Sequence, residues 1–140
     1  RYGVEKVSME KLFKESDILS VHVSLEPDTK NLVKEKHLKM MKPSAYLINT
    51  ARGEIINEAA LLKSLRNKWI AGAALDVMWN EVGGAHLKNN PLIEYARTHT
   101  NLLIVPHLGG ATYEAMQITE DFIADLVKGT IYRHRKSIDW

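Results

Sequence analysis

Several residues that can bind anions or exchange protons follow apolar runs in the sequence. Arg52 comes after the apolar run at residues 45–49, between Ala51 and a glycine. An arginine that leaves the carboxyl end of a buried strand packs poorly there, but it is well placed to bind an anion. Two histidines and two carboxylates follow the other apolar runs: His22, Asp76, Glu81 and His107. We therefore predict that a charged site forms where these runs end.

Four apolar runs are predicted to be strands, and five further segments are predicted to be helices. The strands are expected at residues 17–23, 45–49, 70–77 and 102–106, and the helices at residues 8–16, 29–41, 57–67, 91–97 and 113–127. Gly83 and Gly84 predict a turn, and Gly129 is expected to end the last helix. Crossovers of about 20 residues allow right-handed βαβ units, so we expect a parallel sheet covered by helices on both faces.

The composition is that of an ordinary globular domain. The chain has 140 residues, of which 45% are hydrophobic and 26% charged, with a formal net charge of +2. No apolar run approaches the roughly 20 residues that a membrane helix needs. The first residues are polar and charged, so they do not resemble a secretory signal peptide. The absence of cysteine excludes a disulfide framework and fits a reducing compartment. We expect a cytoplasmic protein with no membrane partner.

Metal and nucleic-acid sites are not expected. The six histidines show no HExxH or similar ligand spacing. The basic run at residues 133–136 has no basic face beside it, so we interpret it as a solvated chain end rather than a nucleic-acid contact.

Three motifs give the chain a family resemblance. The segments INTARG, AALDV and PHLGGAT occur in that order, each at the end of a predicted strand. In this order and spacing they resemble the D-isomer-specific 2-hydroxyacid dehydrogenases, over nearly the whole chain. The resemblance implies an α/β fold with a Rossmann-like, doubly wound parallel sheet. It also implies an oxidoreductase that transfers a hydride between NAD(H) and the 2-carbon of a D-2-hydroxy or 2-oxo acid.

The resemblance also implies a role for each site residue. Arg52 matches the arginine that binds the substrate carboxylate, a task that suits its planar guanidinium fork. His107 matches the acid/base that exchanges a proton with the substrate oxygen, and Glu81 matches the carboxylate paired with it. The remaining matches are to cofactor-binding positions, with NAD expected and NADP left open: His22, Val23, Asn49, Thr50, Ala51, Asp76, Gly109 and Gly110.

One motif of the family does not occur in the chain. No G-x-G-x-x-G is found in the 140 residues, so the pyrophosphate-binding turn is expected to precede Arg1. We interpret residues 1–128 as the C-terminal part of a dinucleotide-binding domain. Residues 129–140 would then be a tail that leads back toward an absent substrate domain. The Rossmann-like sheet would be incomplete, the intact protein is expected to be a homodimer, and the fragment alone is expected to be inactive.

Alternatives to these roles remain. Arg52 could cap the carbonyls of a neighbouring helix, and Glu81 could be a solvated loop carboxylate. Ser24, Val82 and Asn57 depart from the residues usual in the family, without removing a catalytic group. For the whole protein, the alternative function is an NAD(H)-sensing regulatory or corepressor protein without significant turnover, and a third interpretation is an inert structural remnant.

Overall fold

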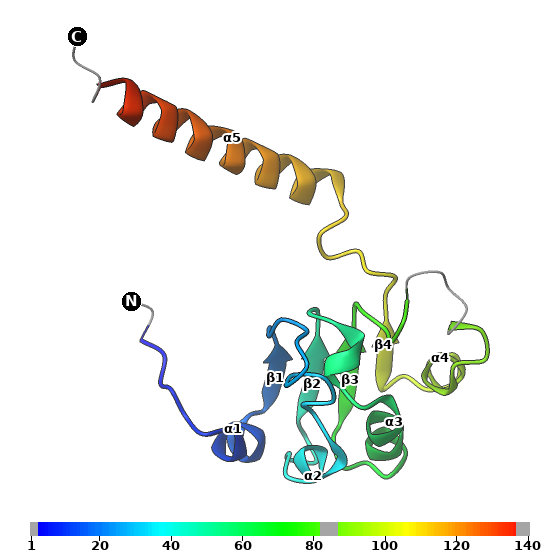
Figure 1. Ribbon diagram of the computed structural model, residues 1–140. Coiled ribbons are helices and arrows are strands. Elements are labelled where there is room, and N and C mark those ends of the chain that lie inside the picture. Colours follow the sequence, from blue (N-terminus) through cyan, green and yellow to red (C-terminus); the bar gives the residue numbers. More distant parts are fainter. Residues whose placement is uncertain (1–2, 82–86, 137–140) are drawn as a thin grey trace. The chain divides into compact units, whose positions relative to one another are not determined.

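The computed structural model describes residues 3–81 and 87–136, with side chains up to residue 130. The chain forms two compact units, Arg1–Pro106 and His107–Trp140, and each is described by itself. Figure 1 shows that the first unit contains the sheet and that the second contains one long helix. The predicted turn at Gly83 and Gly84 lies outside the described residues, as does Val82.

Strands and helices alternate along the first unit. Its elements are α1 (Met9–Glu15), β1 (Ile18–Val21), α2 (Glu35–Leu38), β2 (Tyr46–Asn49), the 3₁₀ helix η1 (Gly53–Ile55), α3 (Glu58–Arg66), β3 (Gly72–Leu75), α4 (Pro91–Ala96) and β4 (Leu102–Ile104). The helix starts follow from capping side chains, because Ser8, Asn57 and Asn90 each accept a hydrogen bond from a backbone N–H of the first turn.

The four strands form one parallel sheet in the order β1-β2-β3-β4. The register places Tyr46 of β2 beside Ile18 of β1 and beside Gly72 of β3. Because all strands run in the same direction, their carboxyl ends lie along one edge of the sheet and their amino ends along the other. The predicted α/β class with about four parallel strands is therefore confirmed.

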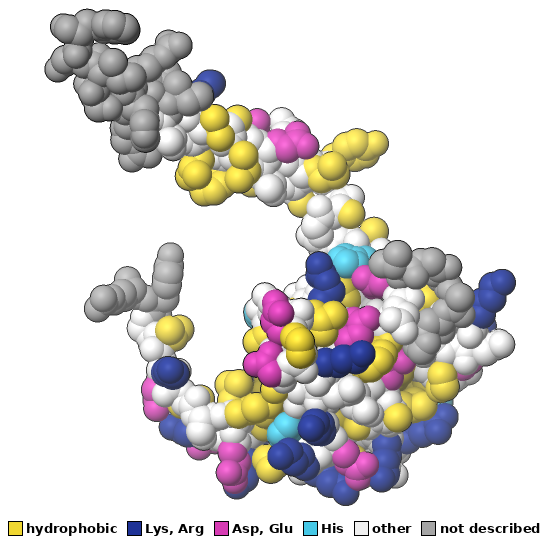
Figure 2. Space-filling view, in the orientation of Figure 1, with side chains coloured by type: hydrophobic (Ala, Val, Ile, Leu, Met, Phe, Trp, Pro, Cys, Tyr) yellow, Lys and Arg dark blue, Asp and Glu magenta, His cyan; other side chains and the backbone are white. Residues whose placement is uncertain are grey.

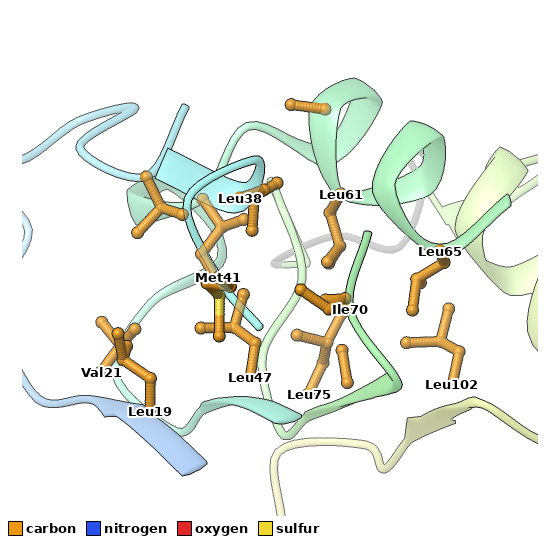
Figure 3. Close-up of a cluster of buried hydrophobic side chains, with 14 of the residues drawn as sticks. Leu19, Val21, Leu38, Met41, Leu47, Leu61, Leu65, Ile70, Leu75 and Leu102 are labelled. Atoms are coloured by element: carbon orange, nitrogen blue, oxygen red, sulfur yellow. The ribbon is translucent and has the colours of Figure 1, made fainter. Parts of the chain in front are cut away.

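The core lies on one face of the sheet. Figure 3 shows strand side chains pointing toward the helical layer of α2 and α3, where Leu38, Leu61 and Leu65 meet them. On the strand side, the core is made by alternate residues of each strand: Leu19, Val21, Leu47, Leu75 and Leu102. This alternation is the period of two that a strand imposes on its side chains.

Within the first unit, the other face of the sheet carries exposed strand side chains, and the expectation that helices cover both faces stays a prediction. Ile18, Tyr46 and Leu103 are 65%, 52% and 61% exposed. Apolar strand runs are typical of a sheet covered on both faces, but burial also requires helices on each side. The helices of the first unit bury only one set of strand side chains.

The predicted helix at 29–41 is wrong in most of its length. Only Glu35–Leu38 is helical, and Asn31 has a left-handed φ of 54°. Val33 forms a parallel bridge with Ile56, and its N–H donates to the Ile55 carbonyl over 3.0 Å. A backbone group used in this bridge cannot also serve a helix, so the long-range pairing replaces the local pattern.

The second unit contains α5 (Tyr113–Lys136), which is longer than predicted. The helix continues through Gly129, which was expected to end it. A glycine inside a helix costs about 1 kcal/mol relative to alanine, which weakens a helix of this length without ending it. Met116, Phe122 and Leu126 are exposed, and Figure 2 shows apolar side chains on the surface of this helix. Among the described residues, no helix is both long and apolar enough to cross a membrane.

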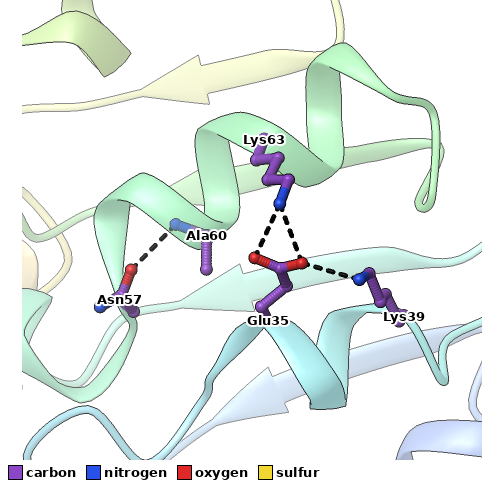
Figure 4. Close-up of polar contacts among 5 residues, drawn as sticks. All are labelled: Glu35, Lys39, Asn57, Ala60 and Lys63. Carbon is purple, nitrogen blue, oxygen red and sulfur yellow. Dashed lines mark hydrogen bonds and ion pairs between the residues drawn. The ribbon is translucent and has the colours of Figure 1, made fainter.

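An ion pair joins α2 and α3 of the first unit. Figure 2 shows acidic and basic side chains intermixed on one face of this unit. Glu35 of α2 binds Lys39 over 2.7 Å and Lys63 of α3 over 3.0 Å (Figure 4). The hydrogen bonds from Lys39 and then from Lys63 lower the pKa of Glu35. Nearby, the ring of His37 stacks on Phe13, and partial burial lowers the pKa of His37.

The end of α3 contains a lysine in an unfavourable backbone conformation. Beyond the cap residue Asn67, the N–H of Lys68 donates to the Leu65 carbonyl and that of Trp69 to the Ser64 carbonyl, which together form a Schellman motif. The motif needs a left-handed residue at position 68, and Lys68 has a φ of 54°. Glycine usually occupies this position, because a Cβ atom disfavours the conformation.

The substitution Lys68→Gly should therefore stabilise the chain. We expect the free energy of unfolding in urea to rise by about 1 kcal/mol, since glycine removes the Cβ clash. The matched control is Lys68→Ala, which removes the same charge and keeps the Cβ atom, so its stability should stay near that of the parent chain. Equal stabilities of the two variants would contradict this account.

Candidate functional site

The turn after β2 is held by a buried amide. Asn49 is 1% exposed, its Nδ2 donates to the Arg52 carbonyl over 2.8 Å, and its Oδ1 accepts from the Ala51 N–H over 3.0 Å. Both polar groups of this side chain are thereby satisfied, as burial requires. Asn49 fixes the backbone that carries Arg52 at the carboxyl edge of the sheet.

The guanidinium of Arg52 has no acidic partner among the described residues. Its Nη1 donates to the carbonyl of the preceding Ala51 over 2.6 Å, which folds the side chain back over its own turn. No ion pair joins it to a carboxylate in the described part of the chain. The alternative of a helix-capping arginine is not what is observed, because the carbonyl belongs to the turn itself. Arg52 therefore offers uncompensated positive charge and unused N–H donors.

A pocket of about 420 Å³ lies beside Arg52, between the ends of β1 and β2. Its lining contains four of the predicted cofactor-binding residues together with the arginine: His22, Val23, Thr50, Ala51 and Arg52. Ser24 and Leu25 complete the lining. The His22 imidazole lies 2.8 Å from the Ser20 hydroxyl through its Nε2. The structure thus brings the predicted residues of the first two strand ends to one concave surface.

The loop after β3 carries Asp76 and Glu81. Asp76 is 7% exposed, and its backbone N–H donates to the Asn49 carbonyl over 2.9 Å, which continues the sheet pairing beyond β3. The Oε2 atom of Glu81 accepts from the Met78 N–H over 3.0 Å. Glu81 therefore braces its own loop.

Two carboxylates that were not predicted as site residues fix this loop from outside. Glu58, in the first turn of α3, accepts from the Trp79 N–H over 3.2 Å and from the side chain of Asn90 over 3.1 Å. Glu54 accepts from the Asn80 N–H over 3.2 Å. The indole of Trp79 also donates to the Ile56 carbonyl over 2.9 Å. The sequence signal for these roles is slight, since a glutamate in a first helical turn is common for electrostatic reasons alone.

Gly53 allows the turn after β2, which carries Arg52, to pack against the loop after β3, which carries Glu81. A Cβ atom at position 53 would overlap the backbone of Met78 and of Trp79. Only a residue without a side chain permits this approach. The glycine that follows Arg52 is therefore a packing requirement, which the sequence alone did not reveal.

His107, Gly109 and Gly110 belong to the second unit. His107 follows Val105, whose N–H donates to the Leu75 carbonyl, and Pro106, the last residue of the first unit. It has a left-handed φ of 55°. The structure describes these residues within their own unit, so the pairing of His107 with Glu81 stays a prediction. Within residues 3–81 and 87–136, no group of three or more acidic or histidine side chains is arranged to hold a metal.

Placing a methyl group at position 53 should separate the two loops. Because the overlap is with backbone atoms, Gly53→Ala is expected to lower the free energy of unfolding in urea by about 3 kcal/mol. The matched control is Gly110→Ala, since a Cβ atom there meets nothing within 4 Å. Its stability should stay within about 0.5 kcal/mol of the parent. An equally small effect at position 53 would show that the loops separate freely.

Comparison with known proteins places the chain among larger relatives. The sequence model of the D-isomer specific 2-hydroxyacid dehydrogenase NAD-binding domain matches residues 1–109. A glyoxylate reductase of Thermococcus litoralis is 43% identical over 122 residues, which are 87% of this chain and 34% of that protein. The chain thus spans about a third of the length of this curated relative.

Two solved structures of this family are also similar to the chain, which again covers less than half of each. D-lactate dehydrogenase of Aquifex aeolicus, complexed with NAD and lactic acid, superposes with a TM-score of 0.72 and 30% identity, over 94% of this chain and 42% of that chain. A D-isomer specific 2-hydroxyacid dehydrogenase of Xanthobacter autotrophicus, in complex with NADPH and MES, superposes with a TM-score of 0.62 and 34% identity. That match covers 71% of this chain and 30% of the other.

Proposed function

The chain belongs to the D-isomer-specific 2-hydroxyacid dehydrogenases, as its motifs predicted, and on that premise we propose that it is part of an NAD-dependent oxidoreductase. The reaction is the interconversion of a 2-oxo acid and a D-2-hydroxy acid. The observation that carries the proposal is the guanidinium of Arg52, which has no acidic partner among the described residues and lines a pocket at the carboxyl edge of the sheet. Ligands of open α/β sheets bind at that edge.

Arg52 binds the carboxylate of the substrate in this proposal. A guanidinium can give two parallel charge-assisted hydrogen bonds to one carboxylate, which fixes the orientation of the acid as well as its position. The backbone of Arg52 is already fixed by Asn49. The substrate therefore meets an arginine whose main chain needs no reorganisation, and the preorganised turn lowers the entropic cost of binding.

His107 and Glu81 provide acid/base chemistry. In the direction of reduction, the His107 imidazolium gives its proton to the carbonyl oxygen of the 2-oxo acid, and in the reverse direction the neutral imidazole takes a proton from the hydroxyl. In this proposal the Glu81 carboxylate pairs with the imidazole of His107. The electron pair of the new C–H bond comes with the hydride.

The residues at the pocket fit one end of a dinucleotide. His22, Val23, Thr50 and Ala51 line the pocket beside Arg52, and the buried Asp76 follows the neighbouring strand. Asn49, Gly109 and Gly110 are proposed to complete this contact. When bound, the dinucleotide would supply the hydride. NAD is the expected cofactor, and the NADPH complex of one relative leaves NADP open. The glycine-rich pyrophosphate turn is not in this sequence.

The enzyme is preferred over the regulatory alternative because the relatives described above are named as reductases and dehydrogenases. For the intact protein we keep as proposals a homodimer, a cytoplasmic location and a small 2-oxo or 2-hydroxy acid as partner.

The proposed bidentate binding of the substrate carboxylate by the Arg52 guanidinium can be tested in the intact protein by Arg52→Lys. Lysine keeps the charge but loses the bidentate geometry, so KM for the 2-oxo acid should rise roughly 10-fold or more, while KM for the cofactor stays within about twofold. The control is Arg97→Lys, since Arg97 binds Glu94 on the surface of α4. Equal rises in both Michaelis constants would argue against a substrate clamp.

The proton transfer is tested by His107→Gln. Glutamine cannot donate a proton as an imidazolium does, so kcat should fall by roughly 10²- to 10⁴-fold with little change in cofactor affinity. Steady-state and binding measurements separate the two quantities. Near-normal turnover in this variant would remove His107 from the mechanism.

A further inference from the structure

A second concave surface lies at the opposite edge of the sheet from Arg52. It has a volume of about 630 Å³ and is formed by the end of α3, the loop into β3, the end of α4 and the loop into β4. We call it the amino-edge pocket, and the residues that matter for its chemistry are Leu65, Arg66, Lys68, Ile70, Tyr95 and His99. The proposed dehydrogenase reaction does not use these residues.

The base of the amino-edge pocket is apolar, and packing in the core fixes its side chains. Leu65 and Ile70 are both buried and belong to the main core, as does Tyr95. The Tyr95 hydroxyl donates to the Oδ1 atom of Asn101 over 3.0 Å, which fixes its ring. Binding pockets for small molecules usually combine such a preformed apolar surface with a few polar groups at the rim.

The rim of the pocket carries positive charge that no acidic group balances. Among the described residues, neither Arg66 nor Lys68 forms an ion pair, and the lining contains no aspartate or glutamate. Other cations near this edge are neutralised, since Lys42 binds Asp17 over 2.8 Å and Arg97 binds Glu94 over 3.0 Å. Two uncompensated cations at one rim create a local positive potential.

Hydrogen-bond donors accompany these cations. The Nδ1 atom of His99 lies 3.0 Å from the Tyr95 carbonyl and 2.9 Å from the Thr98 hydroxyl, so this nitrogen is engaged within its own loop. The imidazole stacks on the Tyr95 ring at 3.8 Å between centroids. Because the Oδ1 atom of Asn101 accepts from Tyr95, its amide N–H groups are left as donors.

The backbone of Lys68 supports the same interpretation. This lysine occupies the left-handed position of the Schellman motif, where glycine would be less strained. A charged side chain is thus kept at the rim at a cost in local stability. Backbone strain at a non-glycine residue is often associated with function.

We propose that the amino-edge pocket binds a small organic anion, with its carboxylate or phosphate at Arg66 and Lys68 and its apolar body against Pro43 and the ring of His99, which line the pocket and are exposed. The site is separate from the proposed substrate pocket, because the two lie at opposite edges of a parallel sheet. Arg66 and Lys68 supply charge, and the exposed surfaces of Pro43 and His99 favour an anion that has an organic body. The proposal does not depend on the dehydrogenase activity.

The test is titration of the 140-residue chain with phenyl phosphate, followed by amide chemical shifts in NMR spectra. Saturable shifts are expected at residues 65–71 and 95–101. Inorganic phosphate should bind at least about fivefold more weakly, because it has no apolar part that can contact Pro43 and the His99 ring. Shifts that do not saturate, or that appear only around residues 22–25 and 50–52, would overturn the proposal.

The charge requirement is tested with Lys68→Gly, a variant that should be at least as stable as the parent. Its dissociation constant for phenyl phosphate should rise about fivefold, and Arg66→Gln should act in the same direction. The matched control is Lys42→Gln, which removes a cation already paired with Asp17. Unchanged binding in Lys68→Gly, or an equal loss in the control, would show that no specific rim contact exists.

Discussion

The side-chain amide of Asn49 is the constraint on which the candidate site depends. Its two hydrogen bonds, to the Arg52 carbonyl and from the Ala51 N–H, are made in a buried environment where either group left unpaired would cost free energy. The turn after β2 therefore has one favourable conformation. The main-chain carbonyl of Asn49 also accepts a hydrogen bond from the Asp76 N–H, so Asn49 connects the ends of β2 and β3.

A further set of hydrogen bonds fixes the conformation of the loop after β3. Glu58 joins Trp79 to Asn90, and in doing so it links the start of α3 to the loop after β3 and to the cap of α4. Glu54 adds a bond to Asn80. These carboxylates lie outside the pocket beside Arg52, yet they determine where the chain that carries Glu81 can run. The loop that carries Glu81 is thus held in place by polar groups that lie outside the pocket.

The fold was predictable where local patterns decide it and not where distant contacts do. Apolar runs bounded by polar turns predicted all four strands, and the cap at Asn57 predicted the start of α3. The helix expected before Met41 failed because Val33 pairs with Ile56, a contact that no local window contains. Arg52 and its pocket neighbours were predictable from strand ends, whereas Glu58 was not, because its partners are more than 20 residues away.

The close approach at Gly53 limits what other chains can share this site. An arginine after a strand end is a weak marker, since many folds place one there for other reasons. The residue after it is more discriminating, because position 53 admits no side chain while Met78 and Trp79 keep their backbone where it is. A relative with the arginine but with a larger residue next to it must have moved one of the two loops. The dipeptide Arg52-Gly53 is therefore the better diagnostic, and it reports on loop geometry as well as on chemistry.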